Sequence, residues 1–202
     1  MNINSSYHLD RETPPDLTAD GAAFVRWWQS ERKPSALPVR KDMRIDRIVR
    51  LMPRLTVLDA VSPDRMVFRL TGTDIDRQAG TNPTGMNVLD ITEPGYRALR
   101  AQRLWNMANW PAIGVFWFRD RFFASENGLS EGVTVPVCAG PDGRSRQLMT
   151  MFSRYRASID RGDPGSAIRQ AMPAVFFYVD IGYGTPDDGT GDSLPLDTLL
   201  RA

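Results

Sequence analysis

Apolar side chains recur at every second position in several short stretches of this chain, which is the period of half-buried β-strands. In the stretch 66–71, one face carries Met66, Phe68 and Leu70. An apolar run at 55–61 precedes it, and the turn residues Ser62-Pro63-Asp64 lie between the two, so the pair predicts a β-hairpin. Further strands are predicted at 111–119, 133–138 and 147–156.

A helical period predicts a first helix from Thr18, with Thr18 or Asp20 as its N-terminal cap. One face of this helix carries Ala23, Phe24, Trp27 and Trp28. The side chains of two adjacent tryptophans must be shielded from water, and two arrangements can achieve this. The helix packs on its own domain, or it pairs with a second subunit. In the second case Phe24, Trp27 and Trp28 are the contact residues of a homodimer, because large aromatic anchors are typical of interfaces.

Two more helices are predicted in the first half of the chain. Lys41 to Met52 is amphipathic, with an apolar stripe through Ile45, Ile48, Val49 and Met52 and a basic side expected to be solvated. The segment 93–109 is the longest helical candidate; it begins after Thr92 as a cap and has Pro94 in its first turn.

The two ends of the chain differ from its middle. Residues 1–18 are polar and aperiodic, which predicts a flexible leader, and 19–37 hold the first helix and a linker. A C-terminal extension is predicted over 159–202. It comprises a helix at 163–172, an apolar run at 174–181, a flexible acidic linker at 182–192 and a short amphipathic turn at 194–200. The apolar run is either an extra strand or a partner contact.

A resemblance to a known family rests on the middle of the chain. Phe68-Arg69-Leu70-Thr71-Gly72-Thr73, then a helix, then Gly80-Thr81-Asn82-Pro83-Thr84-Gly85 before an apolar segment, resembles the PAS-domain family of small alphaproteobacterial proteins (PAS_5 type). Leu51–Asp59 and Thr134–Val137 also fit the family pattern, and the resemblance spans residues 38–158. It implies an α+β fold with a five-stranded antiparallel sheet and helices over one face, here with an N-terminal flanking helix and a C-terminal extension.

Composition narrows the range of partners. The chain has 202 residues, of which 42% are hydrophobic, and this suits one domain with appendages. The 25 basic and 24 acidic residues leave a net charge of +1, so no nucleic-acid partner is expected. The sequence contains neither a secretory signal nor a run of about 18 apolar residues. We therefore expect a cytoplasmic protein with no membrane partner.

The residue types exclude several kinds of site. The one histidine, His8, lies in the predicted leader, so the folded region has no Ser-His-Asp or Cys-His set and no histidine-based metal site. Haem-binding PAS proteins usually offer a histidine to iron, and flavin photosensors of the family carry a cysteine in an Asn-Cys-Arg context. Both features are missing here, and Cys138 lies in a predicted strand. No haem, covalent flavin or metal is therefore expected, whereas an unidentified small-molecule ligand is compatible with the sequence.

The predicted interior is rich in aromatic and methionine side chains. They form a filled core, or some of them line a cavity for an apolar or amphipathic ligand. An arginine aimed inward would favour a ligand with a carboxylate or phosphate group. The candidate pocket residues are Phe68, Arg69, Tyr96, Arg103, Trp105, Trp110, Phe116, Phe118, Met149 and Met151.

By this resemblance the protein is predicted to be a non-enzymatic sensory or regulatory protein. It would bind a small ligand or a signalling protein and so shift the population of its helix arrangements. It would signal through protein–protein contacts, and the expected partners are a second copy of the chain and another signalling protein. One alternative is a small cavity enzyme that uses Asp74 or Asp76 with Tyr96 for acid–base chemistry. The two aspartates otherwise suit a helix cap and a first-turn charge. Another alternative is a ligand-free structural adaptor with a filled core.

Overall fold

The computed structural model describes residues 16–33, 36–119, 129–140, 146–154, 173 and 175–200. Most of the predicted leader and the predicted helix at 163–172 lie outside these residues. The described helices are α1 (Ala19–Ser30), η1 (Arg40–Asp42), η2 (Ile45–Arg54), α2 (Thr73–Ala79), α3 (Pro94–Asn109) and α4 (Leu196–Leu199). The described strands are β1 (Leu55–Ser62), β2 (Arg65–Thr71), β3 (Ala112–Arg119), β4 (Leu129–Cys138), β5 (Arg146–Arg154), β6 (Val175–Asp180) and β7 (Asp192–Pro195).

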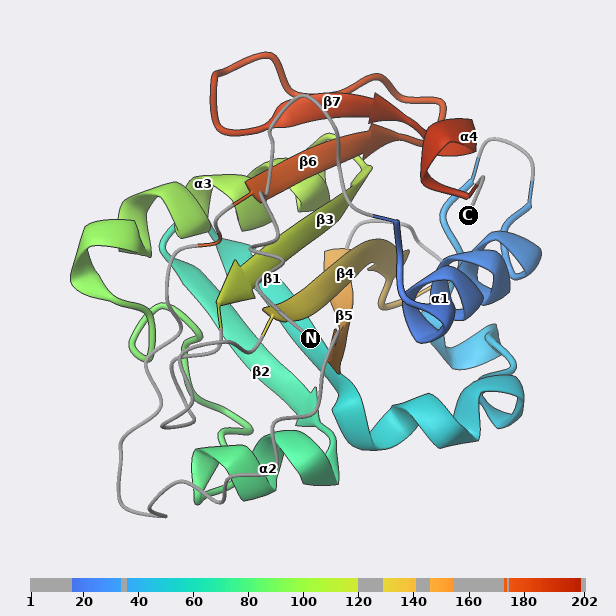
Figure 1. Cartoon of the computed structure of the whole chain (residues 1–202). Helices are drawn as coiled ribbons and strands as arrows, with labels where there is room; N and C mark the ends of the chain where they lie inside the picture. Colours follow the sequence, from blue (N-terminus) through green and yellow to red (C-terminus); the bar gives the residue numbers. More distant parts are fainter. Residues whose placement is uncertain are drawn as a thin grey trace, which may run out of the picture.

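The described strands form one sheet in the order β2-β1-β5-β4-β3-β6-β7 (Figure 1). The five predicted strands are present and adjacent, and all of their pairings are antiparallel. The prediction of five strands was nevertheless wrong, because two more extend the sheet. β6 pairs antiparallel with β3, and β7 pairs parallel with β6. Within the predicted apolar run, β6 is thus a strand of this sheet, and Val175 to Val179 are buried in it.

Helices cover both faces of the sheet, not one as expected. Val115 and Trp117 of β3 belong to a core cluster with α1, whereas the intervening Phe116 and Phe118 belong to a cluster with α3. Figure 1 shows α1 and α3 on different sides of the central strands. Because side chains alternate across a strand, a strand that is apolar at every position needs cover on each side.

The N-terminal helix α1 packs on its own domain. Thr18 caps it as predicted, since its hydroxyl accepts a hydrogen bond of 3.0 Å from the Gly21 amide. Phe24, Trp27 and Trp28 are all buried. The Trp28 indole also donates to the Pro136 carbonyl oxygen at 3.0 Å. These three aromatic side chains therefore do not form the exposed dimer contact that was the alternative prediction.

The basic segment before β1 folds as the 3₁₀-helices η1 and η2, not as the predicted α-helix. Ile48 and Leu51, three residues apart, are buried while Val49 is 60% exposed, and the backbone of η2 departs from helical geometry at Ile48. The predicted stripe was therefore only partly right, because it assumed a regular α-helix.

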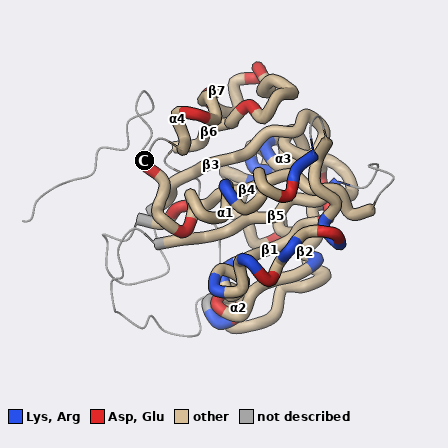
Figure 2. The backbone as a smooth tube through the Cα atoms, turned by 90° about the vertical axis from the view of Figure 1, so that its right-hand side faces the viewer, with Lys and Arg blue, Asp and Glu red and all other residues tan. Residues whose placement is uncertain are grey.

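The basic side of this segment is exposed to solvent, as expected: the side chains of Arg44, Arg47 and Arg50 are 60%, 50% and 70% exposed. Arg50 and Arg54 pair with Asp20 of α1, at 3.0 and 2.7 Å. Arg47 lies 3.8 Å from Glu31, at the other end of α1. Figure 2 shows both signs of charge interspersed along the backbone. The basic side is thus solvated, and its ion pairs with Asp20 and Glu31 also connect it to α1.

The segment 182–192 was predicted to be a flexible linker, but it packs against α3. The Asp188 carboxylate accepts hydrogen bonds from Gln102 at 3.0 Å and from Asn106 at 2.6 Å. At Gly191, any Cβ atom would overlap the Phe176 ring, so glycine permits this close approach. Asp188, whose acidic side chain suggested a solvated linker, instead attaches this segment to α3 through these hydrogen bonds.

Trp28→Ala is expected to lower the free energy of unfolding by about 3–5 kcal/mol, because it leaves a large cavity under α1. It also leaves the Pro136 carbonyl oxygen without its indole donor. Val49→Ala, on the exposed side of η2, should change stability by less than about 0.5 kcal/mol. Urea denaturation of both variants measures the difference. Equal, small losses would contradict the buried position of α1.

Candidate functional site

An aromatic layer lies between α3 and the sheet. The Phe116 ring is its centre, with ring centroids of Phe118, Phe152 and Phe176 at 6.0, 6.3 and 6.2 Å. Gly132 on the neighbouring strand makes room, because any Cβ there would overlap the Phe116 ring. A glycine inside a strand often marks such a close approach. The four phenylalanine rings therefore form one packed cluster on the α3 face of the sheet, and Gly132 leaves the space for it.

Arg100 of α3 is a buried cation. Its side chain packs inward and is 8% exposed, and its guanidinium donates to the Thr92 hydroxyl at 2.7 Å. Thr92, the predicted helix cap, thus has another role: its own hydroxyl donates to the Val88 carbonyl oxygen at 2.8 Å. Burial lowers the pKa of Arg100 to about 10, although Tyr96 opposes the shift. The side chain is still charged at neutral pH.

Arg103 lies one turn further along the same face of α3. Its guanidinium carbon is 4.2 Å from the centroid of the Phe176 ring and 5.9 Å from that of Tyr96. Nε donates to the Thr190 carbonyl oxygen. Nη1 is buried and has no hydrogen-bond partner. Within the described part of the chain, neither Arg103 nor Arg100 forms an ion pair with a carboxylate.

A hydrogen-bonded network closes the C-terminal side of this region. The Thr190 hydroxyl lies 2.7 Å from that of Tyr178 and donates to Asp188 at 2.6 Å. Burial raises the pKa of Tyr178. Burial acts to raise the pKa of Asp188 too, but hydrogen bonds from Thr190, Asn106 and Gln102 outweigh it and the pKa is lowered. Asp188 therefore carries a negative charge next to α3, and its hydrogen bonds hold the loop in place.

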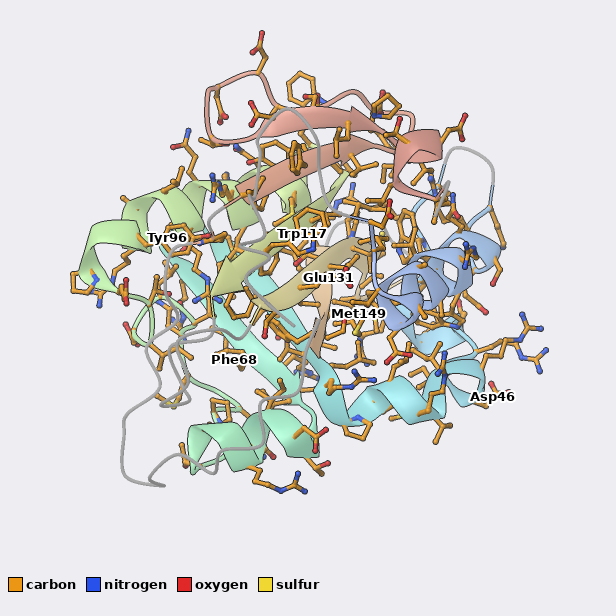
Figure 3. All side chains as sticks on the ribbon, viewed as in Figure 1. Asp46, Phe68, Tyr96, Trp117, Glu131 and Met149 are labelled. Atoms are coloured by element: carbon orange, nitrogen blue, oxygen red, sulfur yellow. The ribbon has the colours of Figure 1, made fainter. Side chains whose placement is uncertain are left out.

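The structure brings together only part of the predicted pocket. Phe68, Phe116 and Phe118 are buried on the α3 face, and Trp105 packs against them. Tyr96 and Arg103 reach the same region from α3, and Figure 3 shows Tyr96 and Phe68 on the side away from α1.

The other four predicted pocket residues lie elsewhere. Met149 and Met151 belong to the core under α1, on the opposite face of the sheet, because the alternation of β5 directs them there. Arg69 is exposed on β2. Trp110 is 53% exposed, and its indole donates to the Tyr183 carbonyl oxygen at 2.6 Å. These residues cannot line one pocket with Phe116.

Sequence reasoning missed Arg100, although a signal for it existed. Tyr96, Arg100 and Arg103 are spaced i, i+4 and i+7, which places them on one helix face. Leu99, the apolar residue before Arg100, is only partly buried, whereas Arg100 is buried. Asp188 was missed because a Gly- and Asp-rich segment is typical of a linker.

The acid–base arrangement that an enzyme would need is not assembled. Asp74 pairs with Arg77 at 2.8 Å, and Asp76 accepts a hydrogen bond of 2.5 Å from the Thr71 hydroxyl. Both lie on α2, far along the sheet from Tyr96 on α3 (Figure 1). The two aspartates have the structural roles of a first-turn charge and a helix-to-strand contact, and neither meets Tyr96.

A family model described as PAS domain matches residues 18–124, which is more than half of the chain. The match begins at the cap of α1, so this helix is part of the matched region, whereas the sequence resemblance placed the domain start at residue 38. No curated protein and no solved structure matches the chain. Among the described helices, none is long and apolar enough to span a membrane. No three His, Cys, Asp or Glu residues gather into a metal-binding group in the described ranges.

Arg100→Met is expected to leave the free energy of unfolding unchanged or to raise it by about 1 kcal/mol, because it removes a buried charge that has no charged partner. Thr92 keeps its bond to Val88 in the variant. Leu104→Ala, on the same face of α3, should lower stability by about 2–5 kcal/mol. Chemical denaturation tests both. A large loss for Arg100→Met would mean that the guanidinium is needed for the fold itself.

Proposed function

Because the chain belongs to the PAS-domain family, we propose that it is a sensory module that binds a small organic anion on the α3 face and signals through protein–protein contacts. PAS domains have sensory and regulatory roles in general, are typically not enzymes, and commonly mediate protein interaction and dimerisation. The particular ligand class and its binding face are our proposal, and they are argued from the side chains of α3.

One observation carries the proposal: two arginines on the inner face of α3 lack a carboxylate partner among the described residues. Removing a cation from water is costly unless it is paired and hydrogen-bonded. Arg100 has a neutral hydroxyl as its partner, and Arg103 has a carbonyl oxygen and aromatic rings. An anion that reaches both guanidiniums would offset the cost of burying them.

The surroundings suggest the rest of the ligand. The Arg103 guanidinium lies over the Tyr96 and Phe176 rings, and such aromatic surfaces favour a flat apolar body. A planar guanidinium matches a carboxylate or phosphate with two parallel hydrogen bonds. The proposed ligand is therefore an aromatic or otherwise apolar acid. Neither haem nor a covalently attached flavin is part of this proposal.

Binding would be transmitted through contacts that join α3 to the C-terminal segment. Arg103 donates to the Thr190 backbone, while Gln102 and Asn106 hold Asp188. A ligand that draws the Arg103 guanidinium toward itself would compete with the Thr190 contact. The arrangement of residues 188–190, which lead into β7 and α4, would then depend on ligand occupancy.

A homodimer and a separate signalling partner stay predictions for this protein. The contact of such a dimer would have to use residues other than Phe24, Trp27 and Trp28, which are covered within the chain. Light scattering of the purified protein measures the subunit count. A monomer at all accessible concentrations would leave the second protein as the sole proposed output.

The first test is a native mass spectrum of freshly purified protein, which reports any retained ligand. Calorimetric titration with 2-naphthoate and its neutral analogue 2-naphthamide follows. The acid is expected to bind at least about tenfold more tightly, because a hydrogen bond to a charged group contributes about 1.5–3 kcal/mol. Arg100→Met and Arg103→Met should weaken binding of the acid by a similar factor. Arg97→Met, an exposed arginine of the same helix, is the matched control.

The outcomes separate three functions. Preference for the acid that is lost in both buried-arginine variants supports an anion sensor. Equal binding of acid and amide would leave a ligand sensor but remove the role of the guanidiniums. No retained mass and no binding of either probe would favour the structural adaptor, whose core is filled and whose function depends on a partner protein.

A further inference from the structure

Glu131 of β4 is a buried carboxylate on the opposite face of the sheet from Arg100. It is 0% exposed and lies toward α1, as Figure 3 shows. Oε2 accepts a hydrogen bond of 2.8 Å from the Thr18 amide, and Oε1 accepts from the Thr18 hydroxyl at 2.8 Å and the Ser153 hydroxyl at 2.9 Å. None of its hydrogen-bond donors carries a charge. The donors to the Glu131 carboxylate are therefore uncharged groups of Thr18, at the start of α1, and of Ser153 in β5.

The first turn of α1 rests directly on this carboxylate. Thr18 is the helix cap, and its hydroxyl both accepts from the Gly21 amide and donates to Glu131. Any Cβ at Gly21 would overlap the Glu131 carboxylate oxygen. Glycine at this position has ordinary helical backbone, so its role is the close approach and not a special conformation. The contact between α1 and β4 thus has its closest point at Glu131.

The charged groups near Glu131 do not neutralise it. Asp20 of α1 has the same sign, and Arg50 and Arg54 of η2 pair with Asp20. β5 supplies the neutral Ser153. From β3, Trp117 is the register partner of Glu131, and its buried indole nitrogen has no hydrogen-bond partner. Burial raises the pKa of Glu131, the hydrogen bonds from Thr18 and Ser153 act in the opposite direction, and Asp20 adds to the increase.

We propose that Glu131 is a proton-controlled latch that sets how firmly α1 is docked on the sheet. When α1 separates from β4, water reaches the carboxylate; when α1 docks, the carboxylate is buried under Thr18 and Gly21. Docking is therefore easier for the protonated side chain, and release is easier for the charged one. The apolar surface that α1 covers, which includes Val115, Val133 and Val135, becomes exposed on release.

The direction of the pH dependence follows from linkage. A glutamate whose pKa is higher in the docked form binds more protons there, so docking strengthens on acidification. Docking weakens as the pH rises above the ordinary glutamate value of 4.5 and through the raised pKa of the docked form. The latch lies on the opposite face from the proposed anion site and does not depend on it.

Hydrogen exchange of the full chain, followed by mass spectrometry from pH 5 to pH 8, tests the latch. The opening of α1, taken relative to the opening of β5 at the same pH, is expected to rise with pH by up to about tenfold per unit in the wild type, the limit for one linked proton. Glu131→Gln cannot ionise and keeps an acceptor for the Thr18 amide. This variant should show no such rise and a more protected α1 at pH 8.

Two further variants make the result decisive. Gly21→Ala should undock α1 at every pH and provides the signal of the open state. Ser153→Ala removes one donor to the carboxylate and also a hydroxyl 2.8 Å from the Thr18 hydroxyl, so it should increase α1 opening at both pH values, and more at pH 8 than at pH 5. If the glutamine variant does not fold, the serine variant decides in the same way. The proposal is overturned if α1 and β5 open together at all pH values, or if the wild-type slope persists in Glu131→Gln.

Discussion

The architecture depends on central strands that are apolar on both faces. In β3, Val115 and Trp117 face α1 while Phe116 and Phe118 face α3, and every one of them is buried. Such a sheet cannot leave one side in water, since the burial of apolar area is the main driving force for folding. The N-terminal helix, the 3₁₀-helices and the C-terminal strands are consequences of this requirement. They are parts of the domain and not attachments to it.

The same requirement makes the few buried charges informative. Arg100 is buried on the α3 face of the sheet and Glu131 on the α1 face, and each forms its hydrogen bonds with neutral groups. A charge in such a place opposes the packing that surrounds it. We therefore connect both proposals to these two residues: ligand binding on the α3 face, and control of α1 on the other. One continuous sheet separates the two residues, so each face can be tested by its own variants.

Sequence patterns predicted most of the local structure correctly. The hairpin of β1 and β2, the long helix α3 and strands β3 to β5 follow from periods that are strong over several residues. The family resemblance is confirmed by the match over 18–124. The prediction was weaker at η2, where Ile48 and Leu51 are buried but Val49 is exposed, and at residues 182–192, where a polar composition concealed the attachment by Asp188.

The candidate site was predicted in part, for a reason that lies in β-sheet geometry. The sequence by itself determined where the β1–β2 hairpin, α3 and strands β3 to β5 lie, that α3 carries arginines at helical spacing, and that the one histidine, His8, precedes the predicted domain. It could not assign faces across strands that are distant in the chain. Pairing in the tertiary structure placed Met149 with α1 and Phe116 with α3. It also brought Glu131, Ser153 and Thr18 together across more than a hundred residues, because register is set by strand pairing and not by local sequence.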